Sequence, residues 1–178
     1  MIYDAFRDYM IKSLTNNYDI ESPYSVEDWE FDFYGHFYAR NSKYLMSKKL
    51  EYYSYSNYDH LFYKTMDTVT RENLEQLLAM TKRIVDFYSK IDEEHMETYI
   101  TYFLIAKESP SAETVSYLKR KTNYLKNFAF GLNGWTKLKI VILVPASKEV
   151  YTNRFGNRDK KNFQEILENF KFLKEGKE

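Results

Sequence analysis

An uncharged run near the middle of the chain constrains the fold more than any other part of the sequence. Residues 98–106 read TYITYFLIA, and aromatic and β-branched side chains dominate the run. Such a composition is typical of a central strand that is buried on both faces. Other layers of structure must cover those faces, and the sequence predicts a helix before the run and another after it. The run therefore favours an α/β fold with a sheet flanked by helices.

The two helices next to this strand have recognisable starts. Thr70 predicts the N-cap of the first, because its hydroxyl can accept a hydrogen bond from an unpaired backbone N–H. Val69 and Leu74 are spaced for the apolar contact that often accompanies such a cap, and the helix is expected to end near residue 91. Ser109-Pro110 predicts the start of the second helix, with serine as the cap.

Alternation of apolar and polar residues predicts three strands before the first of these helices. They are expected at residues 29–39, 43–55 and 59–66. Gly35 marks a bulge in the first, and the short connections favour an antiparallel meander.

Later in the chain, Asn133-Gly134 predicts a tight type I′ hairpin turn, because both residues tolerate positive φ. Its arms are expected at residues 128–132 and 135–144, followed by a strand at 150–152. Apolar residues at helical spacing predict a helix from residue 2 to 14 and a last helix from about residue 157.

The complete element order is α-βββ-α-β-α-βββ-α. With 5 glycines and 3 prolines in 178 residues, the chain favours long regular elements over disorder. We expect one globular domain over residues 1–178, of α/β class with α+β as the alternative, in which helices flank a mixed central sheet.

Several classes of function are disfavoured by residues that the sequence lacks. The chain has no cysteine, which excludes disulfides and thiolate metal sites. Neither a Gly-x-Ser-x-Gly nucleophile motif nor a phosphate-binding loop is present, and no cofactor is expected. The first residues do not resemble a signal peptide, and the longest strongly apolar run, 140–144, is too short to cross a bilayer. We therefore expect a cytoplasmic protein without a membrane partner.

Charge is distributed unevenly, although 26 basic and 26 acidic residues balance over the whole chain. Residues 1–34 hold eight acidic and two basic residues, a formal charge of −6, whereas residues 119–161 hold eleven basic and two acidic residues, a formal charge of +9. Such asymmetry predicts either an anionic partner or attraction between the two segments, within one molecule or across a dimer.

The basic segment contains the candidate anion-binding residues. They are Arg154, Arg158, Lys160 and Lys161 around the start of the last helix, with Lys119, Arg120 and Lys121 in support. Clustered cations attract phosphate groups, and nearby aromatic residues can stack on bases. The aromatic candidates are Tyr124, Trp135, Tyr151 and Phe155.

A metal site is the alternative. His36 and His60 are expected on neighbouring strands, where Asp32 or Asp59 would complete a set of converging donors. The αβββαβ order of the first 110 or so residues resembles the core topology of restriction-endonuclease-like nucleases, which implies metal-dependent hydrolysis. The resemblance implies a Glu-x-Lys motif on a core strand, and this sequence lacks it. After Glu51, the position of the lysine is occupied by Tyr53, and the residue two positions before Lys64 is not acidic.

The sequence therefore favours a non-enzymatic binding module with a basic face for nucleic acid or another phosphate-bearing ligand. A metal-dependent hydrolase with a degenerate nuclease-like core is one alternative. A charge-complementary homodimer without a small-molecule ligand is the other.

Overall fold

The computed structural model describes residues 1–38, 58–89, 97–132 and 134–170. The helices in these ranges are α1 (Ile2–Leu14), α2 (Arg71–Tyr88), α3 (Ala112–Lys121), α4 (Arg154–Asn157) and α5 (Lys160–Asn169), with a 3-10 turn, η2 (Ala129–Gly131). The strands are β1 (Asp19–Glu21), β2 (Tyr24–Val26), β3 (Trp29–Phe31), β4 (Phe33–Tyr38), β5 (Tyr58–Met66), β6 (Glu97–Ala106), β7 (Leu125–Asn127), β8 (Trp135–Val144) and β9 (Glu149–Thr152).

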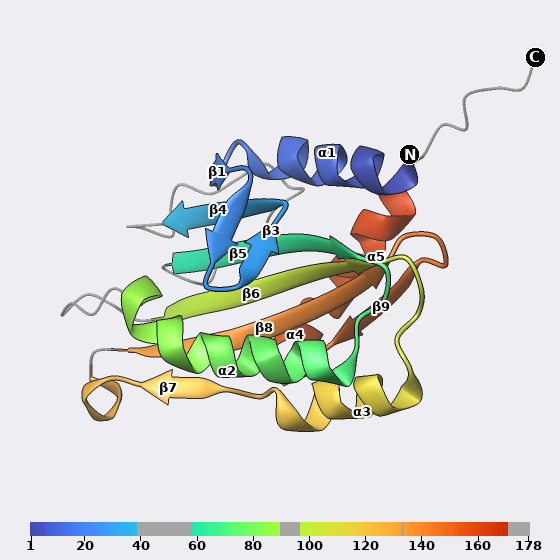
Figure 1. The fold of residues 1–178 in the computed structure, drawn as a ribbon. Helices are drawn as coiled ribbons and strands as arrows, with labels where there is room; N and C mark the ends of the chain where they lie inside the picture. The colour runs from blue at the N-terminus through green and yellow to red at the C-terminus, as the bar shows by residue number, and fades with distance from the viewer. Residues whose placement is uncertain (39–57, 90–96, 133, 171–178) are drawn as a thin grey trace, which may run out of the picture.

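One mixed sheet runs through the described residues in the order β1-β4-β5-β6-β8-β7, and β9 also pairs with β8 (Figure 1). Strands β5, β6 and β8 are parallel, whereas β4, β7 and β9 run antiparallel to their neighbours. Helix α2 connects β5 to β6, and α3 lies between β6 and β8 in the chain. The predicted α/β class, with a mixed central sheet flanked by helices, is confirmed.

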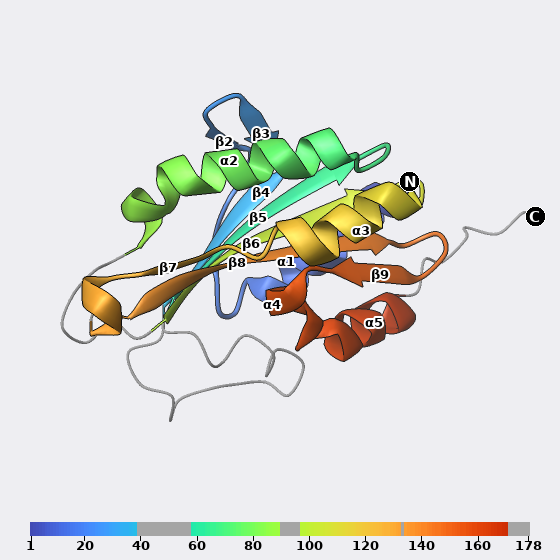
Figure 2. The ribbon, with the colours of Figure 1, turned by 90° about the horizontal axis from the view of Figure 1, so that it is seen from below.

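The central strand lies where the uncharged run predicts it. Strand β6 pairs with β5 on one side and β8 on the other, and residues 98–106 are buried throughout. Both faces of the sheet are covered (Figures 1 and 2): α2 and α3 lie on what we call the front face, and α1 and α5 on the back face.

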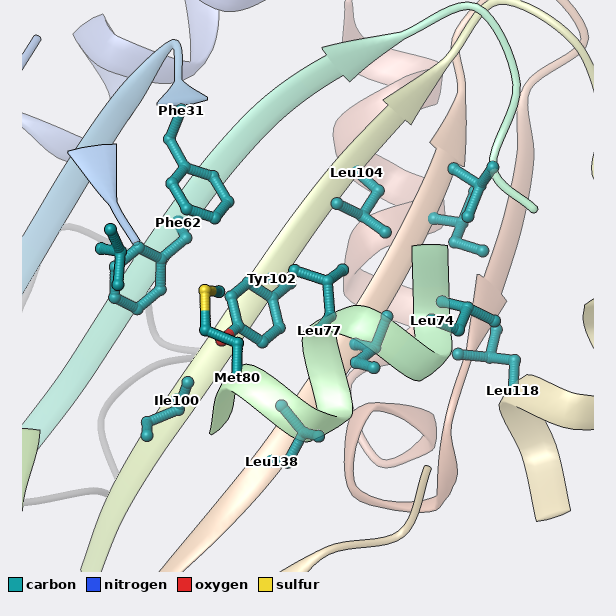
Figure 3. Close-up of a cluster of buried hydrophobic side chains, with 14 of the residues drawn as sticks. Phe31, Phe62, Leu74, Leu77, Met80, Ile100, Tyr102, Leu104, Leu118 and Leu138 are labelled. Atoms are coloured by element: carbon teal, nitrogen blue, oxygen red, sulfur yellow. The ribbon is translucent and has the colours of Figure 1, made fainter. Parts of the chain in front are cut away.

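Each face has its own apolar core. On the front, Leu77 and Met80 of α2 lie over Tyr102 of β6, within a cluster rich in aromatic side chains (Figure 3). On the back, Phe6 of α1 and Phe163 of α5 pack against the opposite side of the same strands. Successive side chains along each strand point alternately into the front core and the back core. The central strands are therefore apolar at almost every position.

Both predicted helix starts can be compared with the structure. Thr70 caps α2 as expected, since its Oγ1 accepts a hydrogen bond from the N–H of Asn73 at 3.2 Å, although the helix ends at Tyr88 rather than near residue 91. The predicted cap of α3 is wrong by two residues. Ser111 rather than Ser109 accepts the hydrogen bond from Thr114 N, at 3.1 Å, and leaves Pro110 in the preceding loop.

The strand predicted at residues 29–39 is divided in two. Asp32 separates β3, which pairs with β2 in a small hairpin, from β4, which pairs with β1 and β5. Gly35 does not form the predicted bulge but lies within the regular part of β4. A Cβ at this position would lie 3.0 Å from the ring of Tyr18, so glycine here makes room for that side chain. Residue 39 and the predicted strand at 43–55 lie outside the described residues.

A hairpin does precede β8, but the predicted two-residue type I′ turn and the predicted first arm are both wrong, because residues 128–134 connect the paired strands. Strand β7 covers residues 125–127 and pairs Asn127 with Trp135, whereas residues 129–131 form a 3-10 turn. Left-handed φ values of 46° at Ala129, 56° at Phe130 and 89° at Gly131 end the strand early. Asn133 lies outside the described residues. The helix predicted from residue 157 is two helices, α4 and α5, and β9 matches the last predicted strand.

Candidate functional site

The seven predicted anion-binding residues are all exposed on the structure, in two groups. Lys119, Arg120 and Lys121 form the last turn of α3. Cations are favourable there, because the carbonyl end of a helix carries a partial negative charge. The second group lies on α4, in the turn that follows it and in the first turn of α5. Arg154 begins α4, Arg158 follows its last residue, and Lys160 begins α5.

Two asparagines join these groups. The side chain of Asn123, just after α3, accepts a hydrogen bond from Arg154 N at 2.9 Å. Asn153, the N-cap of α4, donates from Nδ2 to Thr122 O at 3.1 Å. The start of α4 is therefore fixed against the end of α3, as Figure 2 shows. The structure brings Arg154 beside the basic turn of α3, although more than 30 residues separate them in sequence.

Asn153 also completes the edge of the sheet. Strand β8 is bordered by β7 along one part and by β9 along another, and Asn153 lies between them with 1% of its surface exposed. Its Nδ2 donates to Leu138 O at 2.8 Å, and its Oδ1 accepts from Ile140 N at 3.2 Å and from Gly156 N at 3.1 Å. One amide thus satisfies backbone groups of β8, α4 and the end of α3.

The cations of this region differ in how they are paired. Among the residues that the structure describes, the following form no ion pair: Lys119, Arg120, Lys121, Arg154, Lys160 and Lys161. By contrast, Lys137 and Lys139 of β8 are paired with Glu97 and Asp159. We call the seven exposed residues the basic surface: Lys119, Arg120, Lys121, Arg154, Arg158, Lys160 and Lys161.

The aromatic residues expected to stack on bases are not free platforms. Tyr124 and Tyr151 pack against the front core, and Trp135 donates from Nε1 to Glu97 at 2.9 Å. The ring of Phe155 lies 5.7 Å from the ammonium of Lys137. The exposed aromatic side chain of this part of the chain is instead Phe130, which the sequence reasoning missed because the residue was assigned to a strand.

The structure brings two of the four predicted metal ligands together. His36 of β4 and His60 of β5 are register partners, and their rings stack with 4.7 Å between centroids. The hydroxyl of Tyr34 lies 2.6 Å from Nδ1 of His60. Both imidazoles thus belong to the aromatic packing of the front face.

The two predicted carboxylates lie elsewhere. Asp59 precedes His60 in β5 and therefore points to the opposite face, where its partners are Tyr18 and Thr101. Asp32 accepts a hydrogen bond from Thr65 N at 2.8 Å, near the other end of β5. The predicted four-residue set is not assembled, and no group of three or more His, Asp or Glu residues able to hold a metal ion occurs in the described ranges.

A buried cluster of polar side chains lies on the back face, and the sequence did not predict that its residues come together. The carboxylate of Asp59, 1% exposed, accepts hydrogen bonds from the hydroxyl of Tyr18 at 2.7 Å and from that of Thr101 at 2.9 Å. On the neighbouring strand β8, the ammonium of Lys139 lies 2.6 Å from Asp159 Oδ2 and 4.3 Å from the centre of the Tyr99 ring. The cluster links the segment between α1 and β1, which carries Tyr18, to three parallel strands and the start of α5.

Burial dominates the electrostatics of this cluster. Desolvation raises the pKa of Asp59 above its ordinary value, because the charged form loses its hydration, while the charge of Lys139 and the two hydroxyl donors oppose the shift. The protonated form of Asp59 is therefore favoured more strongly in the folded chain than in the unfolded one.

This shift predicts how an Asp59→Asn variant responds to pH. A raised folded-state pKa means that the contribution of Asp59 to stability is fully present below its unfolded pKa of about 3.9 and is lost as pH rises through the folded value. The variant should therefore gain stability relative to the wild type as pH rises above about 4, where the unfolded chain ionises this carboxyl and the folded chain resists doing so. Urea unfolding of both proteins across this range measures the difference, with Asp28→Asn as the exposed control. A variant that instead loses stability relative to wild type as pH rises would show that Lys139 outweighs burial.

An open depression of about 560 Å³ lies where α2 and α3 begin, beyond the carboxyl ends of β5 and β6. Ligands of open α/β sheets commonly bind at such ends. Its charged lining is mostly acidic, however, with Glu72, Glu75 and Glu113 against one arginine. That arginine, Arg71, lies 2.8 Å from Glu75 and 3.0 Å from Glu113. The depression is thus unlike the basic surface in charge.

Comparison with known proteins gives a family but no activity. No curated protein and no solved structure matches the chain. Among the described residues, no helix is both long and apolar enough to span a membrane. Residues 3–165, most of the chain, match the family described as "Domain of unknown function (DUF8052)". The chain belongs to this DUF8052 family.

Proposed function

We propose that the chain is a non-enzymatic module that binds an anionic, phosphate-bearing partner through the basic surface. The observation that carries this proposal is the junction of α3 and α4. There, the contact of Asn123 with Arg154 N joins two groups of exposed cations that are far apart in sequence. Six of these cations, all but Arg158, form no ion pair within the described residues, and such a set creates a positive field that attracts an anion.

The basic surface also has a supporting frame. Asn153 is buried and bonded to three neighbouring segments, so the backbone that carries Arg154 has a fixed position. The lysines and the arginine of α3 lie on a helix whose polarity they complement. A partner therefore meets a preformed arrangement of charges, which reduces the entropy lost on binding.

The test is a salt titration of binding to short fluorescent single-stranded DNA and RNA, followed by anisotropy. Binding should strengthen as salt falls, because phosphate contacts release counterions. The double variant Arg120→Gln/Arg154→Gln should weaken binding and lower the salt slope by about 1–2, one unit for each lost phosphate contact. The control Lys12→Gln/Lys82→Gln removes the same charge from exposed positions on α1 and α2.

Two outcomes would overturn the proposal in its nucleic-acid form. One is undetectable binding at low salt. The other is an equal loss in the test and control variants, which would indicate attraction to net charge rather than to the basic surface.

A charge-complementary homodimer is the second candidate. The ion pairs that the structure gives for Lys126, Lys137 and Lys139 of the basic segment go to Asp86, Glu97 and Asp159, none of which lies in residues 1–34. The two segments therefore do not neutralise each other through such contacts and can attract a second copy. Light scattering at low and high salt tests this form. A dimer that dissociates as salt rises supports it, and a monomer under both conditions excludes it.

A further inference from the structure

The turn before β8 presents two large apolar side chains to solvent. Phe130 is 106% exposed and Leu132 is 83% exposed, whereas Phe128 at the base of the turn is 7% exposed. Phe130 also has φ of 56°, a left-handed conformation that is unfavourable for a bulky residue. Burial in the core does not offset this strain, and strained, exposed residues gather at sites of contact.

A third large apolar side chain is exposed on the helix that is linked by an ion pair to the first strand of this hairpin. Phe87, 82% exposed, is in the last turn of α2. Its neighbour Asp86 forms an ion pair of 2.6 Å with Lys126 of β7, which ties the last turn of α2 to the first strand of the hairpin. We call Phe87, Phe130 and Leu132 the apolar tip.

The apolar tip and part of the basic surface share one side of the molecule. Figure 2 looks at the side on which α3, β7 and the turn of η2 lie. The basic turn of α3 ends at Lys121, and β7 begins four residues later at Leu125. Exposed apolar groups and unpaired cations thus follow each other along one continuous stretch.

We propose that this side of the molecule docks on an anionic lipid surface. The apolar tip enters the interface between headgroups and acyl chains, while the basic surface contacts the phosphate and carboxylate groups of the lipids. The inference rests on the proposed function and names the partner. Apolar insertion and a basic cluster act as two signals that together give stable attachment where either alone is weak.

The geometry favours a membrane over the other anionic partners. A protruding tip needs no matching cavity in a bilayer, whereas a protein partner must offer one. A nucleic acid gives Phe130 a base to stack on but leaves Leu132 and Phe87 in water. The expectation that the chain has no membrane partner came from the lack of a spanning segment, and attachment at the surface requires none.

The test is co-sedimentation of the full chain with vesicles of phosphatidylcholine, with and without phosphatidylserine. Binding is expected to the anionic vesicles and to weaken with salt. Phe130→Asn should reduce it about tenfold or more, because the phenyl ring is no longer buried in the interface. Asparagine tolerates left-handed φ, so this variant should keep the wild-type thermal stability or exceed it. Phe130→Trp is the matched control and should bind as well as wild type.

Each outcome distinguishes the inference from the proposed function. If the chain binds oligonucleotides but not anionic vesicles, the membrane inference fails and the proposed function stands. If it binds neither, both fail. If Phe130→Asn weakens oligonucleotide binding but leaves vesicle binding unchanged, the partner is a nucleic acid and the membrane inference is overturned. Equal binding to neutral and anionic vesicles would remove the role of the basic surface.

Discussion

Replacing Asn153 with alanine is expected to lower the free energy of unfolding by about 3–5 kcal/mol, a large part of the stability of a typical domain. The side chain makes four hydrogen bonds in a buried position, two as donor and two as acceptor. Alanine leaves backbone groups of Thr122, Leu138, Ile140 and Gly156 without these partners. Each buried polar group that loses its partner costs about 1–3 kcal/mol, less where water can enter.

Urea unfolding followed by circular dichroism measures this loss. Asn123→Ala is the matched control, since the same residue type stands on the same junction but is exposed. Its loss should be about 1 kcal/mol or less, because water can replace both the hydrogen bond that Asn123 accepts from Arg154 N and the one that it donates to Lys119 O. Similar losses in the two variants would mean that Asn153 is not the main connection between α3, β8 and α4. Since Asn153 also holds the backbone of Arg154, its replacement should weaken oligonucleotide binding even where the chain remains folded.

Hydrophobic periodicity and helix-capping residues predicted most of the fold, because both depend on residues that are close together in the sequence. The run at 98–106 is buried on both faces and has become the centre of the sheet, and Thr70 caps α2 as its side chain predicts. The errors arose where tertiary contacts decide between similar local choices. Two serines flank Pro110, and the sequence does not say that Ser109 turns instead to Glu149. Phenylalanine rarely adopts positive φ, so the residue type at position 130 did not predict the left-handed turn found there.

The candidate site was less predictable, because its members come from distant segments. The sequence placed His36 and His60 on neighbouring strands, and the register confirms this, but the alternation of β5 sends Asp59 to the other face. Lys139 contributes to the positive charge counted for residues 119–161, but it is 4% exposed and paired with Asp159. A lysine within an apolar strand was the one available signal of a buried partner, since buried charges are nearly always paired.

Lys139→Met is the second replacement with a large expected effect, a loss of about 3–5 kcal/mol in the free energy of unfolding. Methionine fills a similar volume, so the main change is electrostatic. Asp159 loses its ion-pair partner, and the buried Asp59 loses the nearby positive charge that favours its ionised form. A buried carboxylate without a cation is costly, whereas two neutral groups in the same place are not.

The double variant Lys139→Met/Asp159→Asn should therefore recover much of the loss, and urea unfolding of the single and double variants measures this coupling. The deficit of Lys139→Met should also shrink as pH falls, because Asp59, whose pKa is raised by burial, then binds a proton and no longer needs the nearby cation. Lys137→Met is the control, because Lys137 is more exposed and its ion pair with Glu97 lies nearer to solvent. A deficit that is independent of pH and unrelieved by Asp159→Asn would mean that Lys139 stabilises the fold by packing on Tyr99, not by charge. The stability that Lys139 provides would then come from its contact with the Tyr99 ring, and its ion pair with Asp159 would contribute little.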